Sequence, residues 1–433
     1  MQKLLKGIVG SFLVVGSVFA ANQNATADAY NEYLWFKVFS EVYFIAKNYY
    51  VKPITPKQLI INAAKGMLEK LDPYSEYFTP EELKEFEEDT TGKFGGIGIE
   101  ISYDKGRPII IAPIEGTPAY RVGLKAGDVI VKINGEDTYG MSIADVVKKI
   151  RGKPGTYVEL TIYRPDENKT FTVKVERAII HVTPVKWTVI EPEHIGYVKV
   201  VQFQPDTAEK LKEAIDKLLQ RRVKGLIVDL RNNPGGLLDQ AVAVADLFLP
   251  KGKVVVSIKG RVQHEVLKTQ HPAEIPENMK VVILVNRGTA SASEIVSGCL
   301  QDYKRAILVG ERTFGKFRVQ TLIPVEGGKY GTVKITTAFY YTPKGRMLDK
   351  KGLTPDIEVK MTNEEWEKLY EAVREKRIKN NIGYNEAVLD RKLDKQLQVA
   401  IEVIEGKYHP KGVEAKNNTS KGNEEKNATS VVR

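Results

Sequence analysis

The strongest constraint on the fold is an alternation of short apolar and longer amphipathic segments in the second half of the chain. Apolar runs occupy residues 196–201, 225–230 and 280–285, and each precedes a segment with helical periodicity. The first two of these longer segments cover residues 207–220 and 237–249. Parallel strands need long crossovers, which helices of this length supply. We therefore expect an α/β unit with mostly parallel strands.

The regions on either side differ in texture from this unit, which predicts a multidomain α/β protein for a chain of 433 residues. The N-terminal region has helical periodicity, and β-type runs separated by turns follow it. Asn134-Gly135 is a hairpin signal among these runs. The expected boundaries are 28–90 for the helical region, 91–180 for the β-rich region, 181–360 for the α/β core, 361–405 for a C-terminal helical region and 406–433 for a disordered polar tail.

Local signals place individual helices within these regions. Thr79-Pro80-Glu81-Glu82 orders a cap, a first-turn proline and acidic residues as a helix start prefers. Near the C-terminus, residues 362–379 and 386–404 both have helical patterns. These signals predict one helix that starts at Pro80 and two helices in the C-terminal region.

The N-terminus has the three-part layout of a secretory signal. The first six residues carry two lysines, residues 7–21 are uncharged and mostly apolar, and Val18-Phe19-Ala20 supplies a cleavage site. The apolar run is shorter than the roughly 20 residues that span a bilayer. We expect residues 1–20 to direct export to the periplasm or the outer face of the inner membrane. The signal is either cleaved near Ala20 or retained as an anchor.

Charge and composition exclude several classes of function. The net charge is +10, but the basic residues are spread along the chain and no nucleic-acid motif accompanies them. We read the charge as a solvated surface that prefers acidic surroundings, which leaves association with a membrane surface open. His264 and His271 lack metal-ligand spacing, and we expect neither metal nor cofactor. The single cysteine, Cys299, is expected in the core.

The candidate nucleophile lies in the segment 287–298, RGTASASEIVSG. This segment leaves an apolar strand and enters a helix, and such a turn exposes a side chain and directs free N–H groups to the same place. A serine nucleophile needs donors of this kind for its oxyanion. Ser291 falls at the turn, whereas Ser293 and Ser297 fall inside the helix and need only pack there.

No histidine lies within fifteen residues of this segment, so the base is sought elsewhere. A lysine can serve if it is neutral, but at pH 7 only about one unperturbed lysine in 2,500 is neutral. Lowering its pKa by about three units costs roughly 4 kcal/mol, which burial can impose. Lys316, between Phe314 and Phe317, follows a buried strand and is the candidate. Gln320 is a candidate partner that orients it.

Together these motifs resemble the C-terminal processing peptidases, also called tail-specific proteases. The resemblance rests on TASASEI, on a lysine 25 residues after its first serine, on a glutamine four residues later and on VDLRNNPGG upstream. It implies Ser291 as nucleophile, Lys316 as general base and Gln320 as the residue that orients the lysine. The backbone N–H groups of Gly236 and Ala292 would form the oxyanion hole.

One residue departs from this family's pattern. The family usually reads Gly-Lys-Gly, and Phe317 stands here in place of the second glycine. A ring at this position either tightens the desolvation of Lys316 or displaces the lysine from Ser291. The sequence leaves both outcomes open.

The β-rich region, 91–180, resembles a PDZ domain, and the α/β core then becomes the protease domain. The stretch GLKAGDVI and a preceding glycine-rich loop carry this resemblance. Consecutive N–H groups form an anion pocket, and an exposed strand edge pairs with an extended peptide. The resemblance implies unstructured, apolar C-termini of protein substrates as ligands. The expected carboxylate loop consists of Gly95, Gly96, Ile97 and Gly98.

Three questions stay open at this level: whether the chain is catalytically active, what the PDZ domain does and whether the chain self-associates. The chain could be a catalytically silent protein that binds peptides through its PDZ domain, and Phe317 favours this alternative. In an active enzyme, the PDZ domain either tethers the substrate or gates the site. The terminal helices have apolar faces compatible with a homodimer or a larger homo-oligomer, as in the family.

Overall fold

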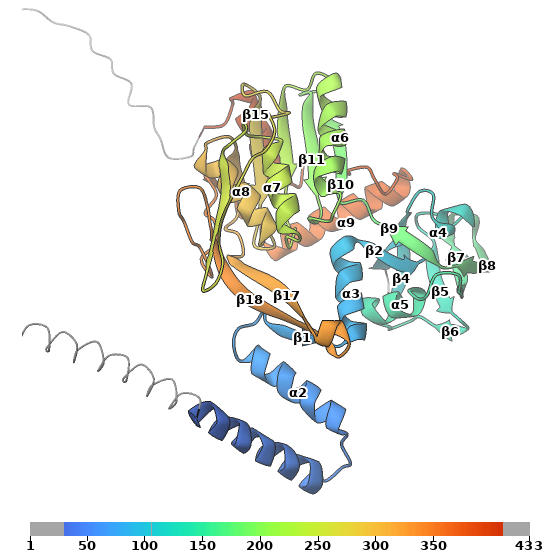
Figure 1. Ribbon diagram of the computed structural model, residues 1–433. Coiled ribbons are helices and arrows are strands. Elements are labelled where there is room, and N and C mark those ends of the chain that lie inside the picture. Colours follow the sequence, from blue (N-terminus) through green and yellow to red (C-terminus); the bar gives the residue numbers. More distant parts are fainter. Residues whose placement is uncertain (1–29, 105, 410–433) are drawn as a thin grey trace, which may run out of the picture. The chain divides into compact units, whose positions relative to one another are not determined.

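The computed structural model describes residues 30–104 and 106–409 (Figure 1). The expected signal at 1–20 lies outside these residues, as does nearly all of the expected polar tail. The chain divides into two compact units: one holds residues up to Glu85 together with Gln320–Thr337, and the other holds Phe86–Val319 and the chain from Ala338 onward. In the described part of the chain, no helix is both long and apolar enough to cross a membrane.

The first unit combines helices with a small antiparallel sheet. Residues 30–49 are helical, and α2 (Pro56–Glu69) follows. β1 (Glu76–Phe78) pairs antiparallel with β18 (Gly331–Tyr341), and β17 (Arg318–Val325) also pairs with β18. Most of the hairpin formed by β17 and β18 belongs to this unit.

The helix start expected at Pro80 is confirmed. α3 covers Pro80–Thr91, and the Thr79 hydroxyl accepts the Glu82 N–H over 3.2 Å. The Glu82 carboxylate in turn accepts the Thr79 N–H, which completes a capping box. Side chain and backbone thus satisfy each other's hydrogen bonds at this end of the helix.

The second unit contains the expected α/β core, a six-stranded sheet in the order β10-β11-β12-β15-β16-β19. β10 pairs antiparallel with β11, and all the other pairs are parallel. The strands are β10 (Val185–Ile190), β11 (Ile195–Val200), β12 (Gly225–Asp229), β15 (Lys280–Val285), β16 (Ile307–Gly310) and β19 (Ile357–Glu358). The α/β class predicted from the sequence is confirmed.

Both faces of this sheet are buried, which explains its continuous apolar strands. Leu226 and Val228 of β12 pack with residues of α6 (Thr207–Gln220), α7 (Leu238–Asp246) and α8 (Ala292–Asp302). Ile227 faces the other way and packs against α10 (Lys395–Glu405). Figure 1 shows α7 and α8 side by side. Cys299 on α8 is fully buried, as expected.

The β-rich region forms a second sheet within the same unit, in the order β3-β4-β5-β7-β8, with β6 paired to β5. Asn134 and Gly135 have φ values of 50° and 83° and form the expected turn. Its elements are β2 (Lys93–Gly96), β3 (Ile99–Asp104), β4 (Arg107–Pro113), α4 (Pro118–Arg121), β5 (Val129–Ile133), β6 (Glu136–Asp137), α5 (Ile143–Ile150), β7 (Tyr157–Arg164), η1 (Pro165–Glu167), β8 (Lys169–Glu176) and β9 (Ala178–His181). β2 and β9, which enter and leave this region, pair with each other.

Among the remaining strands and helices, the last helix begins later than the sequence pattern predicts. β13 (Val254–Gly260) pairs with β14 (His264–Lys268) and with the end of β18. A short helix η2 (Glu326–Gly328) links β17 to β18, and α9 covers Asn363–Lys379. The helix expected over 386–404 begins only at Lys395. The Asp390 carboxylate accepts the N–H groups of Lys392 and Leu393, and such bonds compete with a helix.

Candidate active site

Ser291 lies at a strained turn between β15 and α8. The turn is held by Thr289, whose hydroxyl accepts the Asn286 N–H over 3.0 Å and donates to the Leu230 carbonyl over 2.8 Å. Ser291 itself has φ 54° and ψ −117°, a conformation that residues other than glycine rarely adopt. Strain of this kind clusters at functional sites because the surrounding contacts must impose it.

The three serines of this segment differ in accessibility. Ser293 and Ser297 are fully buried, and the Ser293 hydroxyl donates to the Asn233 carbonyl over 3.1 Å. Only Ser291 is partly exposed. The structure therefore leaves Ser291 as the serine that a substrate can reach.

Glu294 joins the serine turn to the lysine turn. Its side chain is fully buried, and its Oε2 accepts the Ser291 N–H over 3.0 Å and the Lys316 N–H over 2.8 Å. Its Oε1 accepts the Gly315 N–H over 2.7 Å and the Thr313 hydroxyl. Burial raises the pKa of Glu294 even though these hydrogen bonds act to lower it. The sequence motifs did not single out Glu294 as part of the site, although a glutamate three residues after a serine at a helix start is the capping-box signal.

Tyr340 makes a second connection between the two turns. Its hydroxyl contacts the carbonyl oxygen of Ser291 at 3.0 Å and also that of Lys316. Its ring stacks on Phe317, with ring centroids 4.5 Å apart. Phe317 is fully buried in the core, whereas Phe314 is 54% exposed. The two phenylalanines beside Lys316 thus lie in opposite environments, and the ring that replaces the usual glycine packs against Tyr340.

The glycine turn after β12 lies against the serine. A Cβ atom added to Gly235 would lie 2.7 Å from Cβ of Ser291 and 2.9 Å from the nitrogen of Ala292. Gly235 and Gly236 have φ values of 102° and 136°. Within the described residues, the N–H groups of Gly236 and Ala292 donate to no hydrogen bond. The two expected oxyanion donors therefore lie on neighbouring turns, and both N–H groups are available to a substrate oxygen.

Gln320 belongs to the other compact unit, where its Nε2 donates to the Thr336 hydroxyl over 3.4 Å. Its role beside Lys316 stays a prediction.

The glycine-rich loop of the β-rich region divides into two parts. Gly95 and Gly96 belong to β2, whereas Ile97 and Gly98 form the turn that leads into β3. Gly98 has φ 81°, and an added Cβ would lie 2.4 Å from Cβ of Thr117. In the described part of the chain, the N–H groups of Ile97 and Gly98 have no acceptor. These two N–H groups match the anion pocket that a carboxylate loop requires.

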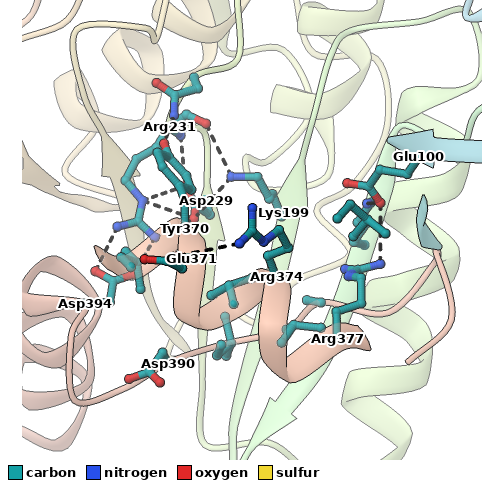
Figure 2. A pocket seen from close by; sticks show the side chains of 18 of the residues that line it. Glu100, Lys199, Asp229, Arg231, Tyr370, Glu371, Arg374, Arg377, Asp390 and Asp394 are labelled. Atoms are coloured by element: carbon teal, nitrogen blue, oxygen red, sulfur yellow. Dashed lines mark hydrogen bonds and ion pairs between the residues drawn. The ribbon is translucent and has the colours of Figure 1, made fainter. Parts of the chain in front are cut away.

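A buried ion cluster holds the strand end that precedes the glycine turn. Figure 2 shows Arg231 between Asp229 and Asp394, and its Nη2 lies 2.7 and 2.8 Å from the two carboxylates. Burial alone would raise the pKa of Asp229, but Arg231 and Lys199 lower it. Because Asp394 caps α10, this cluster ties the turn after β12 to the C-terminal helix. The sequence motif contained Arg231, but the distant partner could not be read from it.

A relative in Bartonella bacilliformis, a carboxy-terminal-processing protease, decides the family. It is 39% identical over 364 residues, which cover 83% of each chain. This chain belongs to the C-terminal processing proteases, peptidase family S41. The S41 family model matches residues 194–359, and a PDZ model matches residues 109–164. The chain is thus a serine-type peptidase with a PDZ domain.

Two further comparisons agree with this S41 assignment. A protein of Staphylococcus aureus, described as a probable CtpA-like serine protease, is 40% identical over 320 residues, which cover 73% of this chain and 63% of the relative. The solved structure of an S41 protease from Bacteroides fragilis matches with a TM-score of 0.53 at 17% identity and covers 85% of this chain and 97% of that one. The latter supports the fold alone.

Proposed function

We propose that this S41 protease is an exported endopeptidase that cleaves proteins near their C-termini, with Ser291 as nucleophile and Lys316 as general base. The observation that carries the proposal is the shared Glu294 carboxylate. It binds the backbone N–H of both residues, so the turns after β15 and β16 are fixed to one point. Gly235 approaches Ser291 from the turn after β12.

In the first half of the reaction, neutral Lys316 accepts the Ser291 hydroxyl proton as Oγ attacks the peptide carbonyl. The N–H groups of Gly236 and Ala292 stabilise the oxyanion. Lys316 then donates the proton to the leaving amine, and an acyl-enzyme remains on Ser291. In the second half, Lys316 takes a proton from the attacking water, and Ser291 regains its proton when the new carboxyl terminus leaves. Gln320 orients the lysine.

The PDZ domain supplies recognition of the substrate tail in this proposal. The N–H groups of Ile97 and Gly98, which have no acceptor in the described chain, donate hydrogen bonds to the terminal carboxylate, and Gly95 and Gly96 support the loop from β2. Apolar residues upstream of the carboxylate then lie along the domain. Tethering and gating of the active site are both compatible with this binding mode.

Export rests on the sequence of residues 1–20, which has the layout of a secretory signal. We place the enzyme in the periplasm or at the outer face of the inner membrane. The exposed apolar residues of the helix at 30–49, such as Trp35 and Phe36, support self-association. Chemical cross-linking of chains with and without Trp35→Glu and Phe36→Glu measures that association, and an unchanged pattern contradicts it.

One experiment tests nucleophile and tail recognition together. Two peptides of identical sequence, one with a free and one with an amidated C-terminus, are incubated with the wild type and with Ser291→Ala. We expect faster cleavage of the free-tailed peptide by the wild type and no cleavage by the variant. Equal cleavage by the variant refutes the assignment of Ser291, and equal rates for the two peptides refute recognition of the carboxylate.

A further inference from the structure

A groove of about 1160 Å³ lies beside the two candidate catalytic turns. Arg287 and Gly288, just before Ser291, line one part of it, and Thr313 and Phe314, just before Lys316, line another. The two turns are joined here, because the Phe314 N–H donates to the Thr289 carbonyl over 3.0 Å. A molecule in this groove therefore contacts the backbone that positions the nucleophile and the base.

The groove carries an excess of positive charge. Five cationic side chains line it: Arg287, Arg312, Lys350, Lys351 and Lys360. The only carboxylates among its lining residues are Glu311, which lies 4.0 Å from Arg287, and Glu358, which lies 3.4 Å from Lys360. The other three cations have no carboxylate partner within the described residues; Arg312 instead donates to the Lys351 carbonyl.

A second cavity of about 740 Å³ shows what a charge-matched lining looks like (Figure 2). Arg231 lies between two carboxylates there, Arg374 pairs with Glu371, and Lys199 lies 3.6 Å from Asp229. Its cations are thus largely neutralised by its own side chains. The groove beside the candidate catalytic turns differs because three of its cations, Arg312, Lys350 and Lys351, are exposed and have no carboxylate partner in the described chain.

Two features of the groove favour an extended peptide as its anionic ligand. Phe314, Met361 and Trp366 add apolar surface to the lining, which suits the aliphatic parts of a polypeptide. A concave site of this form accepts a chain more readily than the flat surface of a bilayer.

We propose that this groove is a subsite for acidic segments of the polypeptide substrate, in which Arg312, Lys350 and Lys351 bind aspartate and glutamate side chains. The proposal rests on the proposed function in one respect, namely that the substrate is a polypeptide. Substrates with carboxylates at the matching distance from the scissile bond bind more tightly, and the preference weakens as salt screens the attraction.

Binding is measured on the full chain carrying Ser291→Ala, so that cleavage plays no part. Two fluorescent peptides differ only in an acidic stretch, Asp and Glu in one and Asn and Gln in the other, and both have amidated C-termini to avoid the PDZ loop. We expect the acidic peptide to bind more tightly. Adding Arg312→Gln, Lys350→Gln and Lys351→Gln weakens its binding about tenfold and leaves the amide peptide unchanged.

A matched control removes the same charge elsewhere. Lys224, Lys251 and Lys304 are exposed and lie outside the groove lining, and their replacement by Gln leaves binding of the acidic peptide unchanged. Equal binding of the two peptides, or an equal loss in the control, overturns the proposal. So does binding to anionic vesicles that depends on the groove cations while the acidic peptide shows none. Because the measurement needs no catalysis, a failure of the proposed peptidase activity remains distinguishable.

Discussion

The backbone N–H groups of Ser291 and Lys316 donate to the same oxygen atom, Oε2 of Glu294, over 3.0 and 2.8 Å. A carboxylate offers two oxygens to the four donors around it, whereas an amide offers one oxygen and brings an NH2 group toward other donors. In either orientation the amide NH2 of Glu294→Gln meets an N–H group of the lysine turn, that of Gly315 or that of Lys316, and displaces this turn. We expect a loss of kcat/KM of about 100-fold, because small displacements of reacting groups have effects of this size. Steady-state kinetics measures it, with Glu402→Gln on the exposed face of α10 as a control that retains full activity.

The proposed base can be tested by a substitution that keeps the positive charge. Arginine stays protonated at any ordinary pH, so Lys316→Arg cannot accept the Ser291 proton. We expect kcat to fall by about 1,000-fold or more, with no loss of the folded structure seen by circular dichroism.

In the wild type, kcat/KM should rise with pH as the lysine loses its proton. A flat profile from about pH 6 to 9 would count against lysine as the base.

A pair of glycine variants distinguishes steric crowding at Ser291 from the backbone strain that alanine suffers at a positive φ. At Gly235, an added methyl group meets Ser291 and the nitrogen of Ala292, whereas at Gly252 it meets nothing within 4 Å. Both glycines have positive φ values, 102° and 85°. We expect Gly235→Ala to lower kcat by at least about 100-fold, because it displaces an oxyanion donor. Gly252→Ala should cost stability alone; an equal loss of activity in both variants would contradict the crowding.

The two phenylalanines beside Lys316 should respond very differently to truncation. Phe317 is fully buried and stacked on Tyr340, so Phe317→Ala should lower the free energy of unfolding by about 3 kcal/mol or more. It should also lower activity, since Tyr340 contacts the turns of both candidate catalytic residues, Ser291 and Lys316. Phe314→Ala, at a side chain that is 54% exposed, should cost less than about 1 kcal/mol. Denaturant unfolding followed by tyrosine fluorescence compares them, and higher activity in Phe317→Ala would refute this account.

Lys186 predicts a pH dependence of stability. Burial lowers its pKa to about 8, and Glu100, 3.7 Å away, opposes this only in part. Between about pH 8 and its ordinary pKa, the unfolded chain binds more protons than the folded one, so stability rises with pH. The full effect is about 3 kcal/mol, and it is lost as pH falls through 8. Urea unfolding from pH 7 to 10 should show this rise relative to Lys186→Met; parallel curves would exclude it.

The sequence predicted those features that depend on neighbouring residues. The strand 280–285 and the helix 207–220 coincide with β15 and α6, because apolar periodicity and burial are the same signal. The place of Ser291 at the turn also follows from the strand-turn-helix pattern, whereas its role as nucleophile stays a prediction. The resemblance to the C-terminal processing peptidases is confirmed by the relative from Bartonella bacilliformis.

What the sequence missed depends on contacts between distant segments. Glu294 reads locally as a helix cap, and only the arrangement of β15 beside β16 shows that it also holds Lys316. Arg231 binds Asp394, which lies 163 residues away in the chain. One miss is local: the helix expected from residue 386 begins only at Lys395, because the Asp390 carboxylate accepts the N–H groups of Lys392 and Leu393 and such bonds compete with a helix.

The three turns that carry the proposed chemistry follow β12, β15 and β16, which are consecutive neighbours in the sheet. Adjacent strands lie about 4.8 Å apart, so the sheet sets the separation of the proposed oxyanion donor, nucleophile and base. This separation does not depend on the length of chain between the strands. Crossover segments such as the hairpin formed by β13 and β14 can therefore diverge in length and sequence while the sheet preserves the spacing of the reacting groups.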